Sequence, residues 1–118
     1  MPSVLFLTTD LMFSSRVLGA AKTLGLECRL LAQPQQIAAA NAADCRLALI
    51  DLTLQPLDLP AAVAAVRAAA PQARIVAFGP HVDEALLGSA KDAGCDLVWA
   101  RSQFHKQYVD LLTAAANP

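Results

Sequence analysis

Short apolar runs alternate with longer stretches of helical spacing along the whole chain. The runs are rich in branched residues and lie at Val4–Leu7, Leu47–Leu52, Arg74–Phe78 and Asp96–Trp99, with a weaker one at Glu27–Leu31. Apolar runs of this length, bounded by turn residues, are typical of strands that are covered on both faces, as in a parallel sheet. The pattern therefore predicts five buried strands.

The stretches between these strands carry the end signals of five helices. The expected helices run from Leu11 or Ser14 to Leu24, from after Pro34 to about Asn41, from Pro60 to Ala70, from about Val82 to Ala93 and from Ser102 to about Ala115. Gly25 and Gly94 suit the left-handed position that closes a helix, and Ser102 suits an N-cap. We therefore expect a single α/β domain over residues 1–118, with five βα units wound into a doubly wound parallel sheet.

Composition and charge exclude several classes of protein. Hydrophobic residues make up 56% of the chain, charged residues 16%, and the formal net charge is −1, which excludes a disordered chain. No basic stripe is present, so we expect no nucleic-acid binding. The three widely spaced cysteines indicate reduced thiols, and no apolar stretch reaches the roughly 18 residues of a membrane span. We expect a soluble, cytoplasmic protein with no membrane contact.

In an open parallel sheet, functional residues gather where the strands end. The polar or special residues at those positions are Thr8, Thr9 and Asp10 after the first strand, Asp51 at the end of the third, Gly79 after the fourth and Arg101 after the fifth. The first turn reads T-T-D-L-M-F-S and has no glycine, so neither a dinucleotide motif nor a P-loop is present. Its hydroxyls leave a flavodoxin-like binder of a small ligand or nucleotide as one alternative.

Three segments resemble the receiver domains of two-component response regulators. L-A-L-I-D-L-T-L is similar to the third strand of that family, R-I-V-A-F-G-P-H-V-D-E to the fourth strand and its loop, and A-K-D-A-G-C-D-L-V-W-A-R-S to the fourth helix and fifth strand. The resemblance covers essentially the whole chain. It implies a flavodoxin-like fold with strand order 2-1-3-4-5, and it places Asp51 at the phospho-acceptor position.

The chain departs from the family where a receiver holds its divalent cation. The acidic pair of the family falls on Thr8 and Thr9, and Asp10 lies one position late. Two hydroxyls cannot supply the negative charge that compensates the dehydration of Mg²⁺. We therefore expect no cofactor and at most weak Mg²⁺ binding, with Asp10 capping the first helix rather than binding metal.

The phosphoryl switch of the family is also incomplete. Its hydroxyl position falls on Gly79 and its aromatic position on Val98, while strand alternation sends Trp99 to the opposite face. The conserved lysine of the family is replaced by Arg101, whose planar fork suits a standing pair with a carboxylate. We expect that carboxylate to be Asp51.

These departures predict a stand-alone pseudo-receiver that acts in signalling through protein–protein contacts. We expect no enzyme and no catalytic residue, because no nucleophile–base pair or metal cluster is present. The alternative is a phosphorylatable single-domain response regulator that uses Asp51. Expected partners are a histidine kinase, another signalling protein, or a second copy through the strip formed by Leu86, Leu87, Ala90 and Tyr108.

Two large apolar residues beside the predicted pocket, Met12 and Phe13, have two interpretations. They either plug the pocket or form an exposed apolar patch for a partner. The sequence leaves both open.

Overall fold

Five parallel strands form one sheet in the computed structural model, which describes residues 2–117. The strands are β1 (Ser3–Leu7), β2 (Glu27–Leu31), β3 (Cys45–Asp51), β4 (Arg74–Gly79) and β5 (Leu97–Ala100). Their order in the sheet is β2-β1-β3-β4-β5, and every neighbouring pair is parallel. The predicted fold class and strand order are confirmed.

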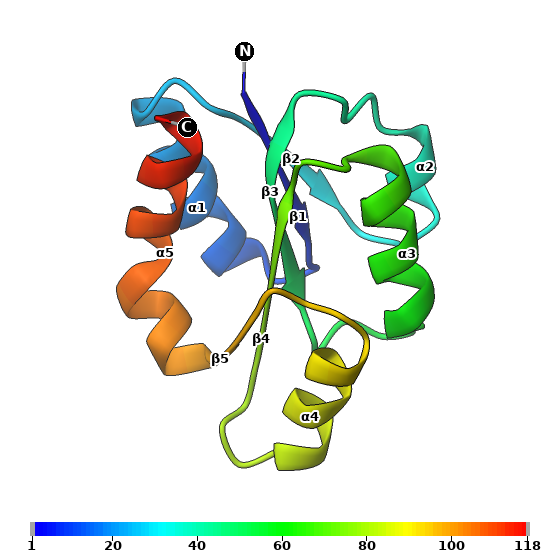
Figure 1. Cartoon of the computed structure of the whole chain (residues 1–118). Helices are drawn as coiled ribbons and strands as arrows, with labels where there is room; N and C mark the ends of the chain where they lie inside the picture. The colour runs from blue at the N-terminus through cyan, green and yellow to red at the C-terminus, as the bar shows by residue number, and fades with distance from the viewer. Residues whose placement is uncertain (1, 118) are drawn as a thin grey trace.

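Within residues 2–117, five helices cover the two faces of this sheet. They are α1 (Leu11–Thr23), α2 (Gln36–Ala39), α3 (Leu59–Ala69), α4 (Glu84–Asp92) and α5 (Arg101–Ala116). Figure 1 shows the sheet nearly edge-on, with α1 and α5 on one side and α2, α3 and α4 on the other. The strands end at the bottom of that view, beside α4 and the beginning of α5.

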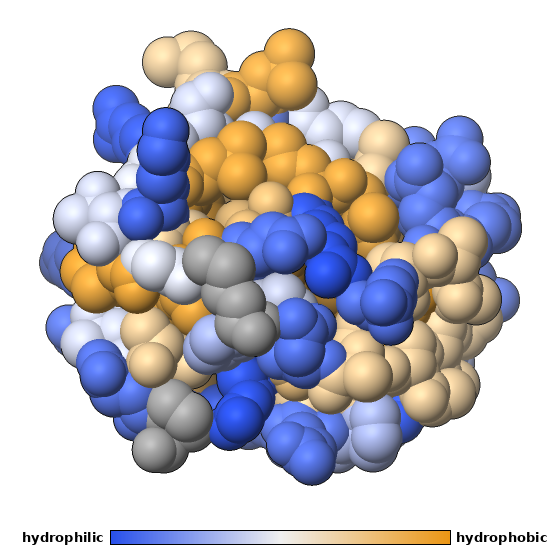
Figure 2. Space-filling view, turned by 90° about the horizontal axis from the view of Figure 1, so that it is seen from above, coloured by the Kyte–Doolittle hydropathy of each residue, from blue (hydrophilic) through white to orange (hydrophobic). Residues whose placement is uncertain are grey.

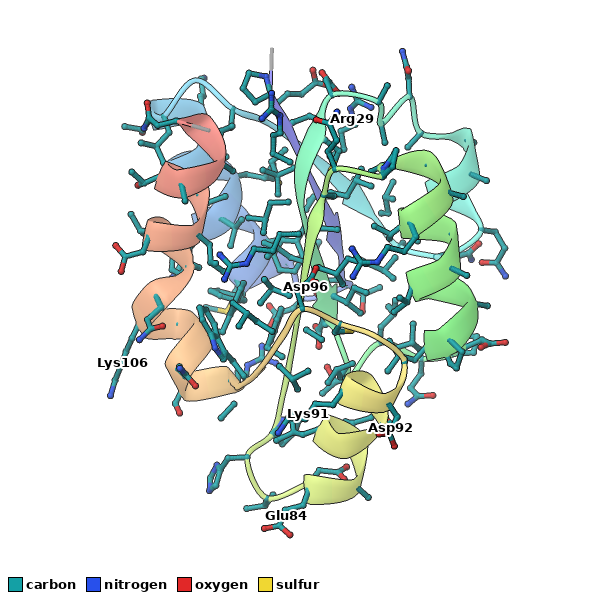
Figure 3. All side chains as sticks on the ribbon, in the orientation of Figure 1. Arg29, Glu84, Lys91, Asp92, Asp96 and Lys106 are labelled. Atoms are coloured by element: carbon teal, nitrogen blue, oxygen red, sulfur yellow. The ribbon has the colours of Figure 1, made fainter. Side chains whose placement is uncertain are left out.

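The core has two halves, one on each face of the sheet. On the α1–α5 side, the four phenylalanines of the chain pack together, and the rings of Phe78 and Phe104 are stacked with their centroids 4.0 Å apart. On the other side, aliphatic residues such as Ile37 and Ile75 pack against the alanine-rich α3. The central strands are buried on both faces, which explains their continuous apolar runs (Figure 3).

Short acidic side chains begin three of the helices. The carboxylates of Asp10, Asp58 and Asp83 accept hydrogen bonds from backbone N–H groups in the first turns of α1, α3 and α4. Asp83 therefore caps α4, which begins two residues after the expected start at about Val82. Gly25 and Gly94 follow the ends of α1 and α4 with φ of 76° and 98°, the left-handed conformation that the sequence predicted.

The predicted N-cap of the last helix is wrong. α5 begins at Arg101, one residue before Ser102, and its N-cap Ala100 makes no side-chain hydrogen bond. The chain passes from β5 into α5 without a loop, so Ser102 already lies inside the first turn. This places Arg101 on a helix rather than on a free loop.

The two ends of the sheet differ in chemistry. Figure 2 looks down on the end where the strands begin, where hydrophilic residues alternate with apolar patches and weakly apolar residues spread over the side of α2 and α3. The opposite end holds the residues selected from the sequence. Between residues 2 and 117, no helix is long and apolar enough to cross a membrane.

Candidate functional site at the carboxyl ends of the strands

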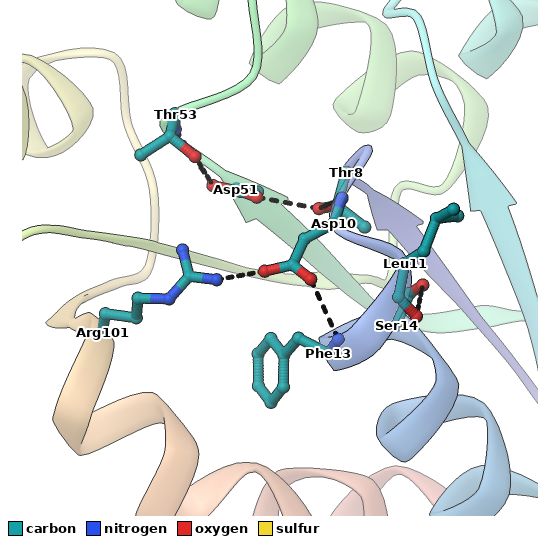
Figure 4. A network of polar contacts seen from close by, with 8 residues as sticks. All are labelled: Thr8, Asp10, Leu11, Phe13, Ser14, Asp51, Thr53 and Arg101. Atoms are coloured by element: carbon teal, nitrogen blue, oxygen red, sulfur yellow. Dashed lines mark hydrogen bonds and ion pairs between the residues drawn. The ribbon is translucent and has the colours of Figure 1, made fainter.

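Asp51 is the central acid of the site, and its carboxylate already has partners. It ends β3 and is 3% exposed. The hydroxyl of Thr8 donates to Oδ2 at 2.8 Å, while the hydroxyl and backbone N–H of Thr53 donate to Oδ1 at 2.6 and 3.0 Å (Figure 4). These three hydrogen bonds satisfy a buried carboxylate without a cation.

Arg101 pairs with Asp10, so the expected ion pair with Asp51 is not formed. The guanidinium Nη2 contacts Oδ2 of Asp10, whose other oxygen accepts the N–H of Phe13 at 3.0 Å. The cap fixes this carboxylate at the start of α1, facing the start of α5. The arginine therefore meets Asp10, while Asp51 is satisfied by hydroxyls.

The same contacts depress the pKa of Asp10. The N–H of Phe13 is the largest cause, the Arg101 guanidinium also lowers the pKa, and partial burial opposes both. The capping role predicted for Asp10 is confirmed. A carboxylate held by a cap and an arginine is not free to swing toward Asp51.

The remaining predicted site residues make no side-chain hydrogen bond with Asp51 or Arg101. Thr9 is exposed and lies outside the network of Figure 4, and Gly79 ends β4 without a side chain. A Cβ placed at Gly79 would lie 3.4 Å from the side chain of Leu52 and 3.6 Å from that of Leu86. Val98 and Trp99 pack against opposite halves of the core, as strand alternation predicted.

The donor set does not fit a divalent cation. Asp51 is one buried carboxylate that faces two hydroxyls, and Asp10 is engaged by Arg101. Throughout the described range 2–117, no three His, Cys, Asp or Glu side chains gather closely enough to hold a metal ion. Mg²⁺ prefers carboxylate oxygens as ligands, whereas the groups that contact Asp51 are hydrogen-bond donors of Thr8 and Thr53.

Met12 and Phe13 differ in burial, so no single interpretation covers both residues. Phe13 is buried and packs edge-on against Phe6, Phe78 and Phe104. Met12 is 78% exposed, as is Leu11 beside it. The first residues of α1 therefore contribute both an anchor in the core and an apolar surface.

Thr53 is the site residue that the sequence analysis missed. It lies two residues after Asp51 in the turn that follows β3 and donates twice to one carboxylate oxygen. An Asp followed two residues later by Thr is a common turn arrangement, because the carboxylate accepts the N–H two residues ahead. This two-residue spacing is the feature of the sequence that could have identified Thr53 as a partner of Asp51.

Comparison by sequence finds no matching protein family and no matching curated protein. Solved structures do match over nearly the whole chain. The receiver domain of a sensor histidine kinase from Pseudomonas aeruginosa, with magnesium in its active-site cleft, matches with a TM-score of 0.73 and 17% identity over 99% of this chain and 98% of that one.

Two further likenesses are similar in extent. A response-regulator receiver domain from Clostridium thermocellum matches with a TM-score of 0.77 and 12% identity, covering 99% of this chain and 95% of that one. A response regulator from Burkholderia pseudomallei with a phosphorylated aspartic acid, calcium ion and citrate gives 0.76 and 18%, covering 99% of this chain and 69% of that one. The chain therefore has the fold of a response-regulator receiver domain.

Proposed function

We propose that the chain is a pseudo-receiver, a signalling module that works through constant protein–protein contacts rather than through phosphorylation. The receiver fold supports a signalling role, because the similar solved structures include receiver domains from both a sensor kinase and response regulators. The departures from the family around Asp51 support a module without phosphoryl chemistry.

The proposal rests on one observation: the carboxylate of Asp51 and the guanidinium of Arg101 each contact a different partner. Asp51 accepts from Thr8 and Thr53, and Arg101 is bound to Asp10. A phosphoryl group on Asp51 would displace at least one hydroxyl and would need charge compensation from a cation that is engaged elsewhere. The resting arrangement thus opposes phosphorylation.

Two of the similar solved structures contain a divalent cation. One of them holds magnesium in its cleft, and another holds calcium beside a phosphorylated aspartic acid. A cation in such a site requires carboxylate ligands beside the acceptor. In this chain the hydroxyl of Thr8 lies 2.8 Å from Asp51, in the space where a second carboxylate would serve.

Phosphotransfer can be tested directly. The intact mass of the chain is followed during incubation with Mg²⁺ and acetyl phosphate, with Asp51→Asn as the control for modification elsewhere. We expect no phosphorylated species on the wild-type chain. Stoichiometric addition that Asp51→Asn abolishes would instead identify a phosphorylatable single-domain regulator.

A variant that is expected to gain metal binding provides a second test of the proposal. Thr8→Asp places a second carboxylate beside Asp51, and two adjacent carboxylates attract a divalent cation. Calorimetric titration with Mg²⁺ is expected to show binding to Thr8→Asp and none to the wild-type chain or to Thr8→Val. Equal binding by the wild-type chain would contradict the proposal.

A further inference from the structure

The beginnings of α1 and α5 form a surface that is both apolar and basic. Leu11 and Met12 lie there, each 78% exposed, and they are the largest apolar side chains that α1 presents to solvent. Directly behind them Phe13 is buried in the aromatic core. The surface is therefore attached to a fixed part of the molecule.

A shallow hollow of about 200 Å³ opens between these two helices. Its lining consists of Asp10, Met12, Phe13, Arg16, Arg101 and His105. The imidazole of His105 lies against the ring of Phe13, with centroids 4.0 Å apart and an interplanar angle of 34°. The hollow thus has aromatic and thioether walls and a basic rim.

The positive charge of this rim exceeds its negative charge. Asp10 is the only acid in the lining, and Arg101 already neutralises it. Arg16 is exposed and takes part in none of the ion pairs formed by residues 2–117. Burial and the nearby guanidinium groups of Arg101 and Arg16 lower the pKa of His105, and Asp10 opposes them only in part.

We propose that this basic-apolar surface docks an acidic segment of a partner protein, with an apolar side chain of that segment seated in the hollow. This inference rests on the proposed function, because it names the kind of partner through which a pseudo-receiver would act. Charge complementarity selects the partner: carboxylates would meet Arg16 and His105, and the apolar side chain would cover Met12. Exposed Leu11 and Met12 distinguish this surface from one that binds only phosphates.

The probe is a short peptide in which pairs of Glu and Leu alternate, titrated into the isotope-labelled chain. We expect the backbone amides of residues 11–16 and 101–105 to shift together. Two control peptides carry Gln in place of Glu, or Ser in place of Leu, and both are expected to bind more weakly. Shifts centred on another face, or no binding at about 1 mM peptide, would overturn the proposal.

Matched variants separate the charge from the apolar contact. Arg16→Glu should weaken binding about tenfold or more, since it replaces a charge-assisted contact with repulsion. Lys22→Glu makes the same charge change on an exposed residue at the other end of α1 and should have little effect. Met12→Gln should weaken binding, whereas Val82→Gln, at a side chain that is also 78% exposed, should not.

Protonation of His105 gives an independent readout. The groups that face its ring are Phe13, Arg16, Arg101 and Asp10, and an acidic segment would favour the charged imidazole. The pKa of His105 lies below its usual range, so binding should strengthen as the pH falls from about 7 to about 5, and His105→Gln should remove that dependence. If a nucleic acid bound this surface as strongly as the Glu-Leu peptide does, the choice of an acidic protein segment as the partner would be contradicted.

The two proposals fail in different ways. Phosphorylation of Asp51 would overturn the pseudo-receiver and leave the peptide result unchanged, because the variants above do not alter the Thr8–Asp51–Thr53 contacts. Loss of peptide binding would overturn the docking surface and leave the phosphorylation result unchanged.

Discussion

Two adjacent residues of α1 contribute to the protein in opposite ways. The ring of Phe13 contacts four other aromatic rings of the buried cluster and that of His105, whereas Met12 projects into solvent. Phe13→Ala should lower the free energy of unfolding by about 3–5 kcal/mol, because it leaves a cavity in the aromatic cluster. Met12→Ala should change it by no more than about 0.5 kcal/mol. Urea denaturation of both variants checks the contrast, and similar losses would show that the α1 start is not packed as described.

Asp10 links the start of α1 to the start of α5. Its ionisation should make the free energy of unfolding depend on pH in the acid range. Its pKa is lowered in the folded protein, chiefly by the N–H of Phe13 and then by Arg101. The ionised carboxylate of Asp10 therefore stabilises the fold in full above the pKa that Asp has in the unfolded chain, about 4. This stabilisation is lost as the pH falls through the lower pKa of Asp10 in the folded protein.

Two substitutions at Asp10 separate the cap from the charge. Asp10→Ala should cost about 1–2 kcal/mol, since both the cap and the ion pair are lost. Asp10→Asn keeps an oxygen that can cap the helix, so it should cost less and should flatten the acid dependence. Thermal unfolding between about pH 2.5 and pH 7 measures both effects. If the unfolding temperature of Asp10→Asn fell at low pH as steeply as that of the wild-type chain, this account would be contradicted.

At the scale of single residues, the sequence could indicate which side chains gather but not which of them pair. Asp10, Asp51 and Arg101 all follow parallel strands, so their proximity was predictable from the sheet alone. Their pairing depends on a few ångströms of helix placement and on Thr53, whose two hydrogen bonds satisfy Asp51 without an arginine. Those details arise only when the whole fold is assembled.

Among the helices, two glycines near the end of α1 have opposite roles. Gly19 lies inside the helix, where a Cβ would meet no atom within 4 Å, while Gly25 follows the helix with φ of 76°. Gly19→Ala should stabilise the protein by about 0.5–1 kcal/mol through higher helix propensity. Gly25→Ala should destabilise it by about 1–2 kcal/mol through left-handed strain. Chemical denaturation of the two variants is the measurement, and shifts of the same sign would contradict the helix boundary.

Element boundaries were most predictable where a residue type has a strict conformational role. Pro60 and Gly25 placed the start of α3 and the end of α1 to within a residue or two. The start of α5 was less predictable because Ser102 has the chemistry of a cap, whereas the chain turns into the helix earlier, at Arg101. A cap preference is weaker than the geometry of a strand that leads directly into a helix.

Across the whole molecule, the basis for a homodimer is weaker than the sequence suggested. Ala90 is fully buried, Leu86 and Leu87 are partly buried against the aliphatic core, and Tyr108 packs against Phe13 and Phe104. These residues are already used within the domain, so we expect a monomer in sedimentation at micromolar concentration. A dimer that Leu87→Glu dissolves would restore the predicted self-pairing.

α4 is attached to the rest of the molecule by little buried surface. Ala90 is its single fully buried residue, and the neighbouring edge strand β5 is half-buried along its length, whereas β1 and β3 are buried almost throughout. Segments with so few buried contacts open by local fluctuations that cost less than global unfolding. In hydrogen–deuterium exchange, the amides of α4 should therefore lose protection well before those of β1 and β3, and this corner should tolerate sequence change that the centre of the sheet does not.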